Sequence, residues 1–337
     1  MTLKKNLHAV ALISSGLDSL LAAKIVQNQG IDIRGVCFVF GFDNLAERAE
    51  AGSVASLFRP FGIPVDVIDF SDIIVPIILN PRHGLGSAVN PCIDCHIAML
   101  RRAKTIMDDM GARFLVTGEV VGQRPMSQTK QMLIHINKET DFGDLILRPL
   151  SAKLLQPTHP ESEGWVDRDK LYDISGRSRK RQFALAEELG IKQFQSPAGG
   201  CILTEPTFSE RVKAYWSHHG KEGVTAETFR LLRLGRHFWP RDHLHVIVGR
   251  DQKDNEALSA FAGGRWAFEA ADTEKTPLVL AEHVHDDSDI RTAASITARY
   301  CSMRGDPFVR ILCQKGMEEM IIEVNPASET DLESWRV

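Results

Sequence analysis

The chain has 337 residues, of which 43% are hydrophobic and 25% charged, and its formal net charge is −4 at pH 7. This composition is that of a folded chain of about two domains, and it excludes a long disordered polypeptide and a protein that coats nucleic acid through bulk positive charge. No apolar run reaches the ~18 residues of a membrane-spanning helix, and residues 1–11 lack the pattern of a secretory leader, so we expect a cytoplasmic protein without a membrane partner.

Strands and helices are predicted to alternate along the first half of the chain. Gly30, Pro60 and Gly111 each follow a helical pattern that they would end. Strands separated by helices of this length favour an α/β fold with a doubly wound parallel sheet, which binds ligands at the carboxyl ends of its strands. The predicted strands cover residues 8–13, 33–40, 65–70 and 113–117, and the predicted helices cover residues 18–29, 45–59 and 92–110.

The junction between the first strand and the first helix has the composition of a phosphate-binding loop. Small residues there expose consecutive backbone N–H groups, and the N-terminus of the following helix favours an anion. Gly16 permits a close approach of the backbone, and Asp18 can hold a Mg²⁺ ion that bridges phosphates. A plain turn with small residues for packing is the alternative. The candidate phosphate-binding residues are Ser14, Ser15, Gly16, Leu17, Asp18 and Ser19.

The hexapeptide SSGLDS of this junction resembles the SGGxDS loop of the PP-loop ATPases. The resemblance implies that ATP is cleaved to AMP and pyrophosphate and that a carbonyl group is activated by adenylation. Ser15 departs from the family pattern, because it stands where the first glycine is usual. A serine tightens the loop but leaves its N–H donors in place, so we expect pyrophosphate binding to survive.

Three of the six cysteines form a second constellation. Cys92 and Cys95 make a C-x-x-C pair at a predicted helix N-terminus, where the helix dipole favours thiolates, and Cys201 follows two glycines far downstream. Spacing alone leaves three alternatives open: a redox disulfide, a zinc site completed by His96 or another ligand, and an iron–sulfur cluster with three cysteine ligands and one open iron. The other cysteines lie in apolar segments, where we expect core positions: Cys37, Cys301 and Cys313.

A polar loop follows the predicted strand at residues 113–117, and we expect it to return to the strand edge that carries the phosphate loop. Its TGE-x-x-GQ and SQT elements, followed by LRPL, make residues 10–203 similar to the adenylation domain of tRNA 4-thiouridine synthetases. The Arg-Pro-Met link at residues 124–126 departs from that pattern. Arg148 is expected to contact a phosphate or merely a carboxylate. The loop residues that would orient ATP or the target base, or else make ordinary loop hydrogen bonds, are Gly118, Glu119, Gln123, Ser127 and Gln128.

The resemblance implies a two-step reaction on tRNA. In that family ATP adenylates the uridine carbonyl oxygen, and a sulfur nucleophile, here sulfide or another sulfur donor, displaces AMP. The three cysteines also match thiolases that hold a [4Fe–4S] cluster, which implies catalytic roles for Cys92, Cys95 and Cys201 and this cluster as a cofactor. The PP-loop resemblance implies a catalytic role for Asp18 and the cofactors ATP and Mg²⁺. The loop elements favour 4-thiouridine at tRNA position 8, and 2-thiouridine is the alternative because both kinds of thiolase share the cysteines.

Recognition of RNA is expected to come from a region other than a module ahead of the PP-loop domain. Known 4-thiouridine synthetases carry an RNA-binding module ahead of that domain, whereas this loop begins at Ser14. One candidate is the basic segment 174–182, with a solvated helix start as the alternative; its cations are Arg177, Arg179, Lys180 and Arg181. A second is the segment 231–258, which resembles the RNA-binding module of NFACT proteins, weakly continued through residues 289–300. It offers Arg233, Arg236, His237, Arg241 and Arg250 as a basic surface, and Phe238 or Trp239 to stack a base unless they are core residues.

We therefore expect a PP-loop domain over residues 1–205 and a smaller α+β RNA-binding domain over residues 206–337. The expected partners are tRNA and a sulfur donor, and a homodimer stays open. Two rival functions remain: a PP-loop enzyme that acts on a free nucleobase or small sulfur compound, and a non-catalytic RNA-binding protein. The loop histidines His283 and His285, beside Asp286 and Asp287, are expected to be solvated rather than metal ligands.

Overall fold

The computed structural model describes residues 7–42, 52–194, 201–273 and 275–337. The chain divides into two compact units, Met1–Thr204 and Glu205–Val337, which are called the first and the second unit below. Each unit has its own sheet and its own buried apolar cluster. None of the described helices combines the length and the apolar character that a bilayer crossing requires.

The first unit is built on a five-stranded parallel sheet with the order β3-β2-β1-β4-β5. Chain connections run from β1 to one side and from β4 to the other, so β1 and β4 flank the point where the strand order reverses, which is where doubly wound sheets bind ligands. The predicted α/β fold class is confirmed. The strands are β1 (His8–Leu12), β2 (Asp32–Val39), β3 (Val65–Asp69), β4 (Phe114–Thr117) and β5 (Ile146–Leu147).

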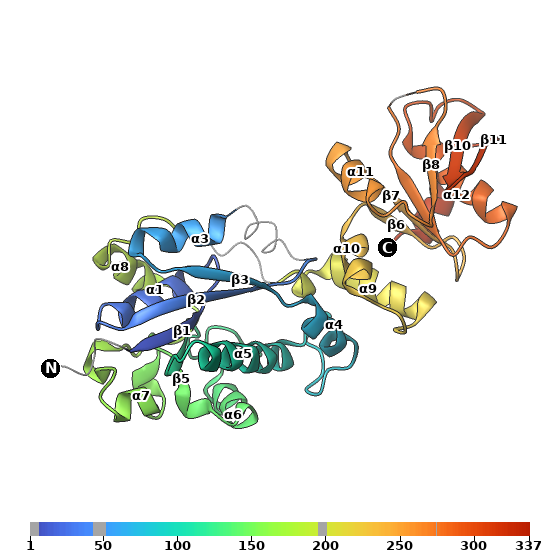
Figure 1. Cartoon of the computed structure of the whole chain (residues 1–337). Coiled ribbons are helices and arrows are strands. Elements are labelled where there is room, and N and C mark those ends of the chain that lie inside the picture. The colour runs from blue at the N-terminus through green and yellow to red at the C-terminus, as the bar shows by residue number, and fades with distance from the viewer. Residues whose placement is uncertain (1–6, 43–51, 195–200, 274) are drawn as a thin grey trace. The chain divides into compact units, whose positions relative to one another are not determined.

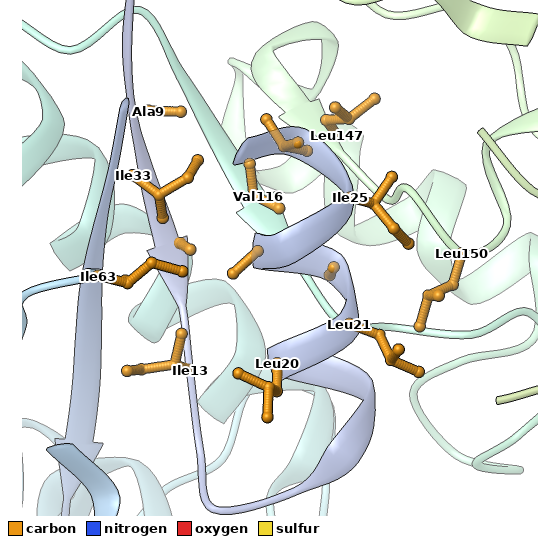
Figure 2. Packing of buried hydrophobic residues seen from close by; sticks show 14 of the residues in the cluster. Ala9, Ile13, Leu20, Leu21, Ile25, Ile33, Ile63, Val116, Leu147 and Leu150 are labelled. Carbon is orange, nitrogen blue, oxygen red and sulfur yellow. The ribbon is translucent and has the colours of Figure 1, made fainter. Parts of the chain in front are cut away.

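Helices cover both faces of this sheet, with α1, α3 and α8 on one side and α5 and α6 on the other (Figure 1). The apolar residues of the first helix and of the sheet belong to one buried cluster, in which Leu20 lies on the side of Ile13, and Leu21 and Ile25 lie on the side of Leu150 (Figure 2). The helices are α1 (Leu17–Gln27), α3 (Ser53–Phe58), α4 (Ser71–Leu79), α5 (Cys92–Asp109), α6 (Lys130–Thr140), α7 (His159–Ser162) and α8 (Lys180–Glu188), and 3-10 turns span Arg59–Phe61, Gly143–Leu145, Ala152–Leu154, Arg168–Lys170 and Ile202–Thr204.

The four predicted strands and the predicted helices 18–29 and 92–110 are confirmed within a few residues. The predicted helix 45–59 lies partly outside the described residues, and its described part is α3 with the turn that follows. Sequence patterns missed α4, because Pro76 inside it reads as a helix breaker. They also missed α6, because Thr129 stands inside the SQT motif. Its side chain caps this helix by accepting a hydrogen bond from the N–H of Met132.

The second unit contains a six-stranded antiparallel sheet with the order β11-β10-β8-β9-β7-β6. Helix α12 packs on it over a cluster that includes Phe238, Phe268 and Ala294. This agrees with the expected smaller α+β domain. The strands are β6 (Arg236–Phe238), β7 (His245–Val248), β8 (Trp266–Ala270), β9 (Val279–Glu282), β10 (Val309–Lys315) and β11 (Glu318–Val324), and the helices are α9 (Pro206–His219), α10 (Ala226–Arg233), α11 (Gln252–Ser259), α12 (Asp287–Tyr300) and α13 (Glu329–Trp335).

Candidate active site

The loop between β1 and α1 is closed by its own serines. The N–H of Ser14 donates to Ser19 Oγ at 3.1 Å, and Ser19 Oγ in turn donates to the carbonyl oxygen of Gly16 at 2.9 Å. The N–H of Gly16 donates to Ser14 Oγ at 3.2 Å, and Leu17 is fully buried. The hydroxyl groups of Ser14 and Ser19, expected to contact phosphate, therefore shape the loop by hydrogen bonds within it. The N-terminus of α1 begins directly after Gly16 and has no side-chain cap.

The loop after β4 meets this phosphate loop, as predicted. A Cβ atom on Gly118 would lie 2.5 Å from the backbone nitrogen of Ser19, so only glycine allows β4 to end this close to the first turn of α1. Further along the same loop, Gln123 Nε2 donates to Asp18 Oδ2 at 2.8 Å. Two motifs that are about a hundred residues apart in sequence thus form one site at the carboxyl edge of β1 and β4.

Several buried polar atoms at this edge have no hydrogen-bond partner among the described residues. They are Asp18 Oδ1, Gln123 Oε1 and Arg179 Nε. The side chains of Asp18 and Arg179 are only 16% and 15% exposed and lie 3.5 Å apart. A carboxylate oxygen, an amide oxygen and a guanidinium N–H that converge in this way fit a Mg²⁺ ion and the phosphates of a nucleotide, because each would otherwise lose hydration without compensation.

Glu119 and Arg148 contact each other in the interior. Arg148 Nε donates to Glu119 Oε2 at 2.8 Å, the hydroxyl of Thr117 donates to the same oxygen, and Nδ1 of His96 lies 3.0 Å from Oε1. Burial acts to raise the pKa of Glu119, but Arg148, His96 and Thr117 hold this pKa well below its usual range, so the carboxylate is ionised. Of the two contacts expected for Arg148, the structure contains the one with a carboxylate, and Arg148 is only 2% exposed.

The remaining loop candidates, Ser127 and Gln128, are buried. The backbone of Gln128 closes a turn, because its N–H donates to Arg124 and its carbonyl oxygen accepts from Gly122. The backbone of Gln128 is thus fixed by two hydrogen bonds, while its amide oxygen Oε1 has no partner among the described residues.

The three cysteines of the predicted cluster site differ from the other three in burial. Cys92 and Cys95 lie on the first turn of α5, and these two and Cys201 are partly exposed, whereas Cys37, Cys301 and Cys313 are buried as predicted. The N–H of Val89 donates to the carbonyl oxygen of Leu203 at 3.2 Å, which joins the segment after Cys201 to the segment before Cys92. The glycines of residues 199–200 lie outside the described residues. Three partly exposed thiols on joined segments suit a cluster with one iron left open.

Sequence patterns missed three residues that the structure places around these groups. Asn90 donates through Nδ2 to the thiol sulfur of Cys92 at 3.1 Å, and the same amide contacts Met126, a residue of the link that departs from the family pattern. Arg179 was expected only in an RNA-binding segment, yet it reaches Asp18. Gln182, one turn further on, is fully buried, and neither of its amide atoms has a hydrogen-bond partner in the described part of the chain. The basic run from Arg177 to Arg181 was the signal that could have located the last two.

Two of the arginines predicted to form an RNA surface in the second unit are held in ion pairs. Arg241 pairs with the buried Asp289, and Arg250 pairs with Asp254 at 2.5 Å. His237, expected on a basic surface, is buried with 0% exposure. Phe238 and Trp239, at 0% and 6% exposure, are core residues, which is the alternative that the sequence left open to base stacking. Packing within the second unit explains this burial. Phe238 belongs to the apolar cluster of that unit, and the ring of His237 stacks on the ring of His245.

A parallel sheet with a serine- and glycine-containing loop at its reversal point places this unit among the doubly wound α/β proteins, which bind ligands at that point. Residues 5–153 match the family model described as thiamine biosynthesis protein (ThiI), and residues 235–336 match the model described as NFACT protein RNA binding domain. The two resemblances stated from the motifs are therefore confirmed.

Two kinds of curated relative match the chain. A tRNA-specific 2-thiouridylase MnmA of Azorhizobium caulinodans is 23% identical over 258 residues, which are 72% of this chain and 62% of the relative. A probable tRNA sulfurtransferase of Acetivibrio thermocellus is 32% identical over 155 residues, 44% of this chain and 37% of the relative. The matches thus span less than two thirds of these relatives. A solved 4-thiouridine synthetase in complex with RNA and ATP aligns at 20% identity over 55% of this chain and 51% of its own, with a TM-score of 0.35.

Proposed function

We propose that this protein is an ATP-dependent tRNA sulfurtransferase that adenylates a uridine carbonyl oxygen and replaces that oxygen by sulfur. The observation that carries the proposal is the junction of two motif loops at the sheet's reversal point, where Gly118 abuts Ser19 and Gln123 bonds to Asp18. The matches to a ThiI model and to a probable tRNA sulfurtransferase support the same class of reaction.

ATP would bind along the edge formed by residues 14–19. Backbone N–H groups at the start of α1 and the guanidinium of Arg179 would neutralise the pyrophosphate, and Asp18 would hold Mg²⁺ through its unpartnered Oδ1. The buried amides of Gln128 and Gln182 are the candidates to orient the adenosine or the target base. Glu119 and Arg148 act as positioning residues, because their buried ion pair fixes the loop that carries Gln123.

Adenylation solves the main chemical difficulty of the reaction. The oxygen of a pyrimidine carbonyl leaves poorly, whereas AMP leaves well, so the uridine oxygen first attacks the α-phosphorus of ATP and expels pyrophosphate. A sulfur nucleophile then adds to the activated ring carbon, and the C–O bond to AMP breaks. Cys92, Cys95 and Cys201 are the residues that would hold a [4Fe–4S] cluster. When bound, the cluster would supply a Lewis-acidic iron suited to holding deprotonated sulfur.

The position of the sulfur has two candidates. The TGE-x-x-GQ and SQT elements favour C4 of the uridine at tRNA position 8. Thiolation at C2 is the second candidate, because relatives that align with 72% of this chain are named as 2-thiouridylases. The same adenylation chemistry serves both positions, so the choice depends on how the base enters the site.

Binding of tRNA is assigned to the predicted RNA-binding domain, residues 206–337, and the chemistry to the predicted PP-loop domain, residues 1–205. The match of residues 235–336 to an NFACT RNA-binding model supports this division. The exposed cations Arg177 and Lys180 would add phosphate contacts, and the reaction would take place in the cytoplasm, where tRNA is used.

The test is an anaerobic reaction of the reconstituted full chain with unmodified tRNA, ATP, Mg²⁺ and sulfide, followed by mass spectrometry of the nucleosides. We expect 4-thiouridine that requires ATP. A 2-thiouridine product would keep the reaction class and select the second candidate. The variant Cys201→Ala should lose thionucleoside formation while it keeps ATP binding. A variant of this kind with full activity would overturn the cluster assignment, and absence of any thionucleoside would favour a free-base enzyme or a non-catalytic RNA-binding protein.

A further inference from the structure

Two histidines and a glutamate converge beside the first turn of α5, outside the groups described so far. Nε2 of His83 and Nε2 of His135 lie 3.0 Å apart. One ligating atom from each of these rings and one carboxylate oxygen of Glu139 all lie within 4.8 Å of one another. His135 and Glu139 are four residues apart on α6, so both side chains lie on one face of that helix.

The ring of His83 is held in one orientation by Asp94. Asp94 Oδ1 lies 2.7 Å from Nδ1 of His83, and its other oxygen accepts the backbone N–H of His83 at 2.9 Å. The side chains of His83 and Asp94 are 17% and 11% exposed. A carboxylate on Nδ1 keeps the proton on that nitrogen and leaves the Nε2 lone pair directed at His135, which is the arrangement that orients histidine ligands at metal centres.

Positive side chains near the group set a limit on its affinity for a cation. Arg82 Nη1 lies 2.7 Å from Glu139 Oε2, and Arg101 donates to the carbonyl oxygen of Glu139 at 2.6 Å. The Arg82 side chain is 71% exposed, so its pairing with Glu139 is largely solvated and worth little. Displacement of this arginine by a divalent ion is therefore inexpensive.

We propose that His83, His135 and Glu139 form a binding site for a divalent transition-metal ion of the Zn²⁺ type. Two imidazoles and one carboxylate are a ligand set that suits this ion, with water in the fourth position. Asp94 is the positioning residue. Because Asp94 stands between Cys92 and Cys95, the bound ion would fix α6, the loop at residues 80–91 and the first turn of α5 relative to one another. The site is separate from the proposed thiolation chemistry and does not depend on it.

The test measures Co²⁺ binding, as a spectroscopic probe, to the untagged full chain in which Cys92, Cys95 and Cys201 are replaced by serine. We expect one Co²⁺ per chain with visible d–d bands and no thiolate charge-transfer band. His135→Gln should weaken binding at least about tenfold, and Asp94→Asn should weaken it by about 10- to 100-fold. The matched control, His243→Gln with His285→Gln, removes the other histidine pair beside a carboxylate and should leave binding unchanged.

Failure of the triple-serine protein to fold would not remove the test. Zinc X-ray absorption on the untagged wild-type chain with its cysteines occupied by a reconstituted cluster should then show zinc with nitrogen and oxygen ligands only, lost in His135→Gln. The proposal is overturned if no stoichiometric metal binds, if the bound metal has sulfur ligands only, or if binding is insensitive to His135→Gln. In those cases the 3.0 Å contact is a plain N–H···N hydrogen bond.

Discussion

Asp18 has one carboxylate oxygen engaged and the other without a partner. Oδ2 accepts from Gln123 and faces Arg179, whereas Oδ1 is buried without a hydrogen bond among the described residues. A carboxylate oxygen is costly to bury in this state, because it loses water and gains no donor in return. Such a cost is tolerated where a ligand restores the interaction, which makes Asp18 the residue whose charge the reaction should need most.

Asp18→Asn should therefore reduce tRNA-dependent pyrophosphate release by about 100-fold or more, the size of effect seen when one transition-state contact is removed. Its fold should persist, because the asparagine oxygen can still accept from Gln123. The measurement is a coupled pyrophosphate assay together with urea unfolding. Asp173→Asn is the control, since Asp173 also pairs with an arginine, Arg181, but on the exposed surface. Unchanged pyrophosphate release by Asp18→Asn would remove this residue from the chemistry.

At the scale of elements, the site depends on how closely β4 approaches α1. Gly118 is the point of contact, and a Cβ there would meet backbone atoms of Asp18 and Ser19 rather than a side chain that can rotate away. The neighbouring pair Glu119 and Arg148 then holds the following loop by charge. Steric contact sets the distance between the two elements, and the buried ion pair sets the direction in which the loop leaves.

Gly118→Ala should destabilise the first unit by about 1–3 kcal/mol, because the extra methyl group forces β4 and α1 apart. Nucleotide affinity should fall further than stability alone explains, since Asp18 and Ser19 would move. Urea unfolding and ATP titration measure the two effects. Gly263→Ala adds the same methyl group where no atom lies within 4 Å and should change neither. Equal behaviour of the two variants would contradict the close contact.

Histidines packed beneath the sheet of the second unit make its stability depend on pH. Burial first, and then the neighbouring His283 and His245, lower the pKa of His219 to about 4. The pKa of His237 and of His245 is also lowered, chiefly by burial. A histidine whose pKa is lower in the folded state than its unfolded value of about 6.5 is protonated first in the unfolded chain, so folding loses free energy as pH falls.

The second unit should therefore lose stability as pH falls from about 6.5 towards 4. Glu282 does not contribute in most of this range: burial acts to raise its pKa, but His245 and Arg265 lower it to about 2, so its contribution is lost only below the unfolded value of about 4.3. Thermal unfolding of the full chain between pH 7.5 and 5 measures the effect, and His219→Gln should make the dependence shallower. A flat profile would show that these histidines titrate normally.

At the scale of the whole molecule, local patterns predicted the α/β fold and the loops, and long-range contacts decided the rest. Short apolar runs between helical patterns predicted β1 to β4, because a buried parallel strand has an almost continuous apolar sequence. The partnership of Arg179 with Asp18 joins residues 161 positions apart, and the burial of Trp239 depends on a sheet formed by strands from most of the second unit. The basic run marks Arg179 as a candidate to bind an anion, but no local pattern shows its partner Asp18. For the same reason the sequence leaves open whether Trp239 stacks a base or lies in the core.

The division into two units leads to the last prediction. Each unit buries its own apolar cluster, so a chain that ends after Thr204 should still fold. We expect it to bind ATP as the full chain does but to bind tRNA at least about tenfold more weakly, a loss of ~1.4 kcal/mol. Filter binding of tRNA over a salt series measures this, since phosphate contacts weaken as salt rises.

The matched comparison is the full chain with Arg177→Ala and Lys180→Ala, which keeps the second unit and removes exposed cations from the first. If the shortened chain binds tRNA as tightly as the full chain while this double variant binds weakly, recognition belongs to the basic segment at residues 177–181. The second unit would then need another partner. If tRNA binding is weakened only in the shortened chain, the second unit makes the main contact with tRNA. A protein of net charge −4 can then bind RNA, because binding depends on the charges of one unit and not on the net charge of the whole molecule.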